Sequence, residues 1–165
     1  MVRGIHHIAI STPDLDRMLA FYRDLIGFEE VVLDFSWGVD NVVGPRVMRT
    51  NGPSVGRVVL LRAGNAFLEL FEFERPAPKL GDPGRPVVDH GITHFCIDVD
   101  DVGLEYERLS AAGIEFHCSP QSMGMGIYTT YARDPDGNVF EVQQIPAASH
   151  KCALPPATLP PLSAP

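Results

Sequence analysis

Two short segments of the sequence each place one histidine at a matching position on an expected β-strand. Residues 4–14 contain His7 and residues 91–101 contain His94. In both segments apolar residues take the alternate positions, so each histidine points to the face opposite the helix that follows its strand. A neutral imidazole binds metal ions and accepts protons near neutral pH, so both histidines are candidates for such chemistry.

A glutamate takes the equivalent place on a later strand of each half. Glu69 is flanked on its face of the strand by Phe67 and Phe71, and Glu141 by Val139 and Gln143. An ionised carboxylate is costly to bury beside aromatic rings unless a cation compensates its charge. Glu69 therefore either faces solvent or meets positive charge.

The four side chains together form a plausible ligand set for one divalent ion. Mixed imidazole and carboxylate ligands suit Fe, Mn, Co, Ni or Zn. Taken singly, each histidine or glutamate is more often a surface or structural residue, but their matching places in two repeated halves favour a shared role. The remaining histidines show no such pattern and are expected to be structural or on the surface: His6, His90, His117 and His150.

Hydrophobic periodicity predicts an α+β protein in which each half runs strand, helix and three further strands. In the first half we expect strands at 5–11, 28–35, 57–63 and 66–73, with a helix that begins at Thr12 and ends at Gly27. In the second half we expect strands at 92–99, 114–117, 127–133 and 139–145, a helix over 101–112, a loop over 123–126 and a turn over 134–138.

Stretches rich in proline and glycine suggest the limits of these halves. We expect a first module at residues 1–75, a linker at 76–90, a second module at 91–146 and a Pro/Ala-rich tail at 147–165. Residues 36–56 hold no clear element and form a long loop, a feature that is usually functional or mobile in a compact domain.

Composition narrows the partners and the compartment. The chain has 165 residues and a formal net charge of -8, which argues against nucleic acid as a partner because phosphate contacts need a basic surface. Apolar runs fall short of a membrane span. The three cysteines form no CxxC pair, which favours a reducing compartment and hence the cytoplasm.

Several of these motifs together resemble the vicinal oxygen chelate superfamily, the glyoxalase/bleomycin resistance/dioxygenase group. The residues that carry the resemblance are His7-Ile8-Ala9-Ile10, Asp14, Phe21-Tyr22, Gly27-Phe28, Phe67-Leu68-Glu69-Leu70, His94 to Asp101, Asp134 to Asn138 and Glu141. The resemblance implies two tandem βαβββ modules that form an incomplete mixed β-barrel with helices outside. It places the four metal positions on His7, Glu69, His94 and Glu141.

The His/Glu/His/Glu set is similar to that of glyoxalase I and methylmalonyl-CoA epimerase. This likeness implies a lyase, isomerase or epimerase that chelates two neighbouring substrate oxygens and moves a proton next to a carbonyl through an enediolate. Glu141 and Glu69 become the candidate base and acid, in either order. Ser11 stands where glyoxalase I has an arginine that helps to hold glutathione, so glutathione is not the expected substrate part.

Two other functions on the same fold stay open. An Fe(II) extradiol-type dioxygenase would use His7, His94 and Glu141, although Glu69 would then fill a position that O₂ chemistry needs open. The second is a non-enzymatic protein that sequesters a ligand or an antibiotic. Partners are expected to be a second copy of the chain, as a homodimer, and a small molecule with an apolar or aromatic body. Strand parity and loop position place the following residues at the substrate pocket: Phe67, Phe71, Cys96, Gln143, Trp37 and Tyr128.

Overall fold

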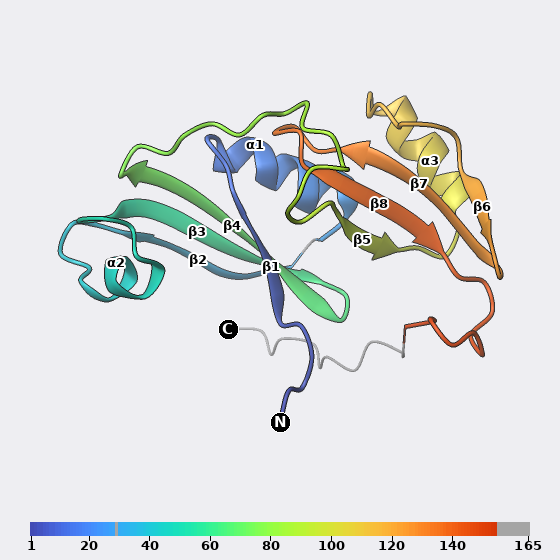
Figure 1. The fold of residues 1–165 in the computed structure, drawn as a ribbon, viewed down its shortest axis with the longest axis horizontal. Coiled ribbons are helices and arrows are strands. Elements are labelled where there is room, and N and C mark those ends of the chain that lie inside the picture. The colour runs from blue at the N-terminus through green and yellow to red at the C-terminus, as the bar shows by residue number, and fades with distance from the viewer. Residues whose placement is uncertain (29, 155–165) are drawn as a thin grey trace. The chain divides into compact units, whose positions relative to one another are not determined.

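The computed structural model describes residues 1–28 and 30–154 and confirms an α+β fold built from two tandem modules (Figure 1). The described chain divides into two compact units, one that ends at Gly81 and one that begins at Asp82. Each unit holds a four-stranded mixed sheet. Residues 155–165, most of the predicted tail, lie outside the described residues, and the proposed linker at 76–90 stays a prediction.

The first module begins with a strand that pairs in parallel with the last strand of the same module. Its sheet order is β1-β4-β3-β2, and the other pairs are antiparallel. Its elements are β1 (His7–Ser11), α1 (Leu15–Leu19), η1 (Ala20–Ile26), β2 (Val31–Trp37), α2 (Val43–Met48), β3 (Val55–Ala63) and β4 (Ala66–Arg75). Its core joins α1 to the helix-facing side of the sheet through the buried residues Leu15, Met18, Val59, Leu61, Leu68 and Leu70.

The first helix differs from the prediction at its start and in its second half. Asp14, not Thr12, is the N-cap, because its extended backbone lets its carboxylate accept a hydrogen bond from the Arg17 backbone N–H. The Thr12 hydroxyl instead accepts from the Asp14 backbone N–H. From Ala20 the helix widens into the π-helix η1, which ends at Gly27 in a left-handed conformation with φ 100°.

The predicted loop over 36–56 is partly structured. Strands β2 and β3 extend into it, and α2 forms between them. The helix is started by the side-chain oxygen of Asn41, which accepts hydrogen bonds from the backbone N–H groups of Val43 and Gly44. Because α2 spans six residues and none of them is buried, no hydrophobic periodicity marks it in the sequence.

The second module repeats the arrangement with a sheet order of β5-β8-β7-β6. Its elements are β5 (Phe95–Asp98), α3 (Val102–Ala111), β6 (Gln121–Gly124), β7 (Ile127–Arg133) and β8 (Val139–Gln144). Asp101 caps α3, and its carboxylate accepts from two backbone N–H groups. The core is formed by the buried residues Val102, Leu109, Ala132, Phe140 and Val142.

Two predictions for this module were wrong. Residues 114–117 form a single bridge between Phe116 and Ala132 rather than a strand. The strand is β6, whose last two residues begin the expected loop at 123–126. β6 is exposed along its length, so its pairing with β7, not burial of an alternating face, defines it. None of the helices formed by the described residues has both the length and the apolar composition that a membrane crossing requires.

Candidate metal centre

The first module brings His7 and Glu69 together from neighbouring parallel strands. In the register of β1 and β4, Ala9 lies opposite Glu69 and His7 lies opposite Phe67. The Nε2 atom of His7 is 3.4 Å from Oε2 of Glu69. The pairing predicted from strand parity is therefore present within this module.

The second module forms the equivalent pair. Cys96 on β5 lies opposite Glu141 on β8, and His94 immediately precedes β5. The Nε2 atom of His94 is 3.0 Å from Oε2 of Glu141, and the side chain of Glu141 is 12% exposed. This histidine therefore meets its glutamate although it lies just outside the strand on which it was expected.

Both pairs have the spacing of two ligands on one divalent ion. Ligand atoms about 2.1 Å from an ion lie about 3.0 Å apart at a right angle and about 3.4 Å apart at a tetrahedral angle. The 3.0 Å separation in the second module also falls within the range of a hydrogen bond from imidazole to carboxylate, whereas the 3.4 Å separation in the first module lies beyond it. Among residues 1–28 and 30–154 no group of three or more His, Cys, Asp or Glu side chains is placed to hold a metal ion, so neither pair by itself makes up the expected set of four ligands.

The other ring nitrogen of each histidine also has a partner. Nδ1 of His94 is 2.9 Å from the Thr93 hydroxyl oxygen, and Nδ1 of His7 is 2.9 Å from Nδ1 of His6. Histidines that bind metals usually hold their second nitrogen in a hydrogen bond of this kind. Sequence reasoning missed His6 and Thr93; their position directly before each candidate ligand was the available signal.

Glu141 lies among hydrogen-bonding side chains. The Thr129 hydroxyl donates to Oε1 of Glu141 at 2.5 Å, and Tyr131 lies directly opposite Glu141 on β7. The Tyr131 ring meets the His94 ring edge-on at 5.0 Å. Desolvation, followed by the Glu141 charge, raises the pKa of Tyr131 to about 12 and that of Cys96 to about 12, so both groups stay protonated at neutral pH.

Glu69 lies among apolar side chains instead. Its cross-strand neighbours are Ala9 on β1 and Leu60 on β3, where the second module has Cys96 and Tyr131. Among the described residues of the first module, His7 supplies the single polar side-chain contact to this carboxylate. The two pairs are therefore alike in the short distance from Nε2 to the carboxylate, but the two glutamates differ in the polar side chains around them.

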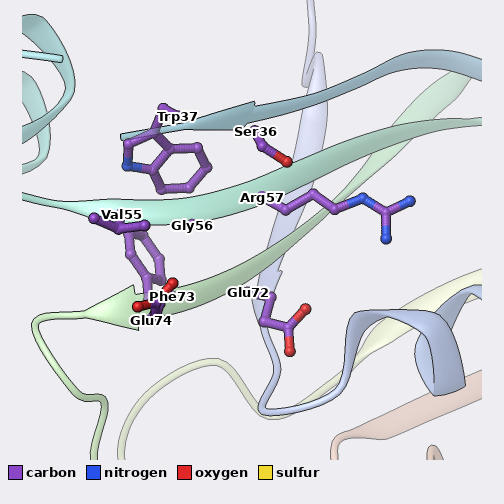
Figure 2. Close-up of a pocket in the computed structure, with 8 residues that line it drawn as sticks. All are labelled: Ser36, Trp37, Val55, Gly56, Arg57, Glu72, Phe73 and Glu74. Atoms are coloured by element: carbon purple, nitrogen blue, oxygen red, sulfur yellow. The ribbon is translucent and has the colours of Figure 1, made fainter. Parts of the chain in front are cut away.

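The predicted pocket residues fall in several places. Phe67 and Phe71 share the Glu69 face of β4, and Phe71 packs against Trp37 with ring centroids 6.1 Å apart. Trp37 also lines a pocket of about 410 Å³, with the rings of Trp37 and Phe73 at one end and Arg57 and Glu72 at the other (Figure 2). The full lining is Ser36, Trp37, Val55, Gly56, Arg57, Glu72, Phe73 and Glu74, so Trp37 is the one predicted pocket residue that contributes to it.

The three remaining predicted pocket residues belong to the second module. Cys96 is beside Glu141, whereas Gln143 pairs with Asp98 on β5 and with Thr129 on β7. Tyr128 lies on β7 and is 43% exposed. Their contact with a substrate stays a prediction.

Comparison with known proteins gives consistent matches. The family described as the Glyoxalase/Bleomycin resistance protein/Dioxygenase superfamily matches residues 4–142. A 2-epi-5-epi-valiolone epimerase from Actinomyces sp is 29% identical, over 88% of this chain and 81% of the relative. A biphenyl-2,3-diol 1,2-dioxygenase from Paraburkholderia xenovorans is 27% identical over 82% of this chain, which spans 39% of that protein.

A solved structure supports the fold independently of sequence. A glyoxalase family protein from Bacillus cereus superposes with a TM-score of 0.71 over 87% of this chain and 95% of that chain, at 18% identity. The family match spans both modules and both histidine–glutamate pairs. The chain therefore belongs to the glyoxalase/bleomycin resistance protein/dioxygenase superfamily.

Proposed function

We propose that the chain is a divalent-metal-dependent isomerase, epimerase or lyase of the glyoxalase type. The observation that carries the proposal is that each module sets one histidine Nε2 against one glutamate oxygen at the spacing of metal ligands. The pairs His7/Glu69 and His94/Glu141, supplied by one chain or by two chains of a dimer, would together hold one ion of Fe, Mn, Co, Ni or Zn. When bound, such an ion supplies a site for two neighbouring substrate oxygens and stabilises negative charge that develops on them.

The glutamates would carry the proton. A carboxylate oxygen of one glutamate takes the proton from the carbon next to the carbonyl, and the C–H electron pair moves to the carbonyl oxygen to give an enediolate. Return of a proton to the opposite face of that carbon inverts it, whereas return to the neighbouring carbon isomerises the substrate. Glu69 and Glu141 are the candidate pair, in either order. Tyr131 and Cys96, both neutral at pH 7, add no charge that would repel the enediolate.

The substrate would be a small molecule with vicinal oxygens and an apolar or aromatic body. Phe71, on the face of β4 that carries Glu69, begins an aromatic surface that continues to Trp37 and Phe73. Such a surface favours apolar groups over phosphate-rich ones. We also propose a homodimer in the cytoplasm, where three exposed free cysteines would stay reduced.

Metal analysis of the purified chain tests the proposal first. We expect about one divalent ion per site in the wild type. The ion should be lost in His94→Ala and kept in His90→Ala, because within the described part of the second module the His90 ring makes no polar contact with His94 or Glu141. A metal-free wild type that still binds a ligand with undiminished affinity would favour the sequestering function instead.

Deuterium incorporation from D₂O then tests the reaction. The metal-loaded chain would be given 2-epi-5-epi-valiolone, the substrate named for the epimerase relative, and methylmalonyl-CoA, the substrate of the enzyme with the similar ligand set. Exchange of the hydrogen next to the carbonyl, lost in both Glu69→Gln and Glu141→Gln, would support the proposal. Exchange that persists in both variants would remove these glutamates from the mechanism.

The dioxygenase of the same superfamily is the second candidate. His7, His94 and Glu141 are the two histidines and one carboxylate that suit non-haem Fe(II), and a biphenyl-2,3-diol dioxygenase is among the relatives. O₂ uptake with 2,3-dihydroxybiphenyl and Fe(II) tests it. Uptake that increases in Glu69→Ala would favour the dioxygenase, and a wild type without uptake would exclude that substrate.

A further inference from the structure

We infer that Thr93 and His6 are positioning residues that hold the two candidate ligand histidines with Nε2 toward the carboxylates and allow each ring to change tautomer in place. The inference rests on the proposed function, because the ion is what the freed Nε2 lone pair would bind. It goes further by giving roles to two residues outside the ligand set.

In the second module the supporting group is the Thr93 hydroxyl. Nδ1 of His94 is 2.9 Å from the Thr93 hydroxyl oxygen, while Nε2 is 3.0 Å from the Glu141 carboxylate. A neutral imidazole has one N–H and one lone pair, and an ionised carboxylate only accepts. For the neutral ring without a cation, the hydrogen therefore lies on Nε2, and Nδ1 accepts from the Thr93 hydroxyl.

A cation on Nε2 reverses these roles. The ring hydrogen must then lie on Nδ1, and the Thr93 oxygen must accept it. A hydroxyl group can donate or accept by rotation about its C–O bond, so His94 can change tautomer while its ring stays in place. Valine at this position would offer neither interaction.

In the first module the supporting group is the imidazole of His6 instead of a hydroxyl. Nδ1 of His6 is 2.9 Å from Nδ1 of His7, so one of the two must donate and the other accept. His6 can take either role, because its own hydrogen can lie on Nδ1 or on Nε2. Its ring is held by stacking on Phe67, with centroids 4.8 Å apart and planes 27° apart.

Further contacts fix the support beneath His6. The Arg62 guanidinium lies 5.5 Å from the centre of the Phe67 ring, and Arg62 is ion-paired with Glu30. In both modules the supporting residue directly precedes the histidine, at a point where the chain is only entering its strand. Adjacent residues in a regular strand point to opposite faces, so strand parity alone predicts neither contact. A threonine and a histidine thus both offer a group that can donate or accept a hydrogen bond at Nδ1 of the histidine that follows them.

Thr93→Val and Thr93→Ser test the inference in the full-length chain. Valine keeps the branched shape without the hydroxyl, whereas serine keeps the hydroxyl. Zn²⁺ affinity would be measured by competition with a chelating dye, and ¹⁵N NMR of the imidazoles would report the His94 tautomer with and without Zn²⁺. We expect about 10- to 100-fold weaker Zn²⁺ binding in Thr93→Val and near wild-type binding in Thr93→Ser.

The NMR readout is independent of activity. In the wild type, His94 should carry its hydrogen on Nε2 without Zn²⁺ and on Nδ1 with Zn²⁺. In metal-free Thr93→Val the Glu141 carboxylate still favours the hydrogen on Nε2, but Nδ1 loses its hydrogen-bond donor, so the ¹⁵N resonance of Nδ1 should shift downfield. His6→Asn and His6→Phe form the matched pair for His7, because asparagine can donate or accept and phenylalanine cannot.

The outcomes separate this inference from the proposed function. Equal Zn²⁺ affinity in Thr93→Val and the wild type, or equal loss in Thr93→Val and Thr93→Ser, overturns the positioning role. A wild type that binds no Zn²⁺, Fe²⁺, Mn²⁺, Co²⁺ or Ni²⁺ overturns the proposed function. In that case the metal-free NMR spectra still decide: a shifted His94 Nδ1 resonance in Thr93→Val but not in Thr93→Ser supports the inference, and an unchanged one in Thr93→Val overturns it.

Discussion

Replacing Thr129 with valine is expected to destabilise the second module more than the same replacement at Thr130. Both residues lie on β7, are buried with 3% and 1% exposure, and donate a side-chain hydroxyl. Thr129 donates to the Glu141 carboxylate at 2.5 Å, whereas Thr130 donates to the backbone carbonyl of Cys118 at 2.6 Å. The two sites therefore differ mainly in the charge of the acceptor.

The charge of the acceptor sets the expected magnitude. A hydrogen bond to a charged group contributes about 1.5–3 kcal/mol to stability, and one to a neutral group about 0.5–1.5 kcal/mol. The Thr129 hydroxyl also lies 3.2 Å from the Val142 carbonyl, but its single hydrogen goes to the shorter, charged contact. Thr129→Val should thus lower the free energy of unfolding by about 1 kcal/mol more than Thr130→Val.

Urea unfolding of the metal-free chain, followed by circular dichroism, measures both variants. Glu141→Gln and the Thr129→Val/Glu141→Gln double variant complete a thermodynamic cycle that isolates the pairwise term. We expect a coupling of about 1 kcal/mol or more between the two positions and none between Thr130 and Glu141. A Thr129→Val cost no larger than that of Thr130→Val, with additive double variants, would refute the reasoning.

Other side chains give further predictions. Desolvation and the Glu141 charge raise the pKa of Cys96 to about 12, so iodoacetamide should label this thiol slowly at pH 8 and rapidly only as the pH approaches 12. Peptide mapping by mass spectrometry measures the labelling rate. A fast reaction at pH 8 would contradict the raised pKa. Asp134→Ala removes the buried acceptor of three hydrogen bonds in the turn before β8 and should cost about 3 kcal/mol in urea unfolding. The helix cap variant Asp101→Ala should cost about 1 kcal/mol. Gly56→Ala would place a Cβ 2.4 Å from the backbone of β4, so it should cost about 1–3 kcal/mol, and unfolding at the wild-type urea midpoint would refute the contact.

Local patterns in the sequence are sufficient to predict each histidine–glutamate pair. His7 and Glu69 share a face because alternation along a strand has a fixed period, and the repeat gives the same result for His94 and Glu141. Thr129 and Tyr131 could also have been found by counting. The turn at 134–138 sets the register of β7 on β8 and places Tyr131 opposite Glu141.

Other features depend on contacts that no local pattern encodes. β6 is recognised by its pairing with β7, and α2 by the hydrogen bonds from its first two backbone N–H groups to the Asn41 side chain, because neither element buries an alternating or helical stripe. The contact between His6 and His7 lies at the first residue of β1, and strand parity makes the wrong prediction for these neighbours in sequence. The sequence repeat also does not predict the difference between Tyr131 and its first-module counterpart Leu60. It shows that their positions are equivalent, but their side chains differ in chemistry.

This difference leads to a prediction about which glutamate contributes more to metal affinity. The Thr129 hydroxyl already holds the Glu141 carboxylate in place. Glu69 has apolar neighbours, so binding of the metal ion must order its side chain. Ordering a glutamate side chain costs up to about 1.5–2 kcal/mol, which corresponds to about tenfold in affinity. Glu141→Gln should therefore weaken Zn²⁺ binding about tenfold more than Glu69→Gln, measured by dye competition. If the Thr129 hydrogen bond causes this difference in Zn²⁺ affinity, adding Thr129→Val to both variants should reduce the difference. An unchanged difference would show that the two modules bind the ion unequally for another reason.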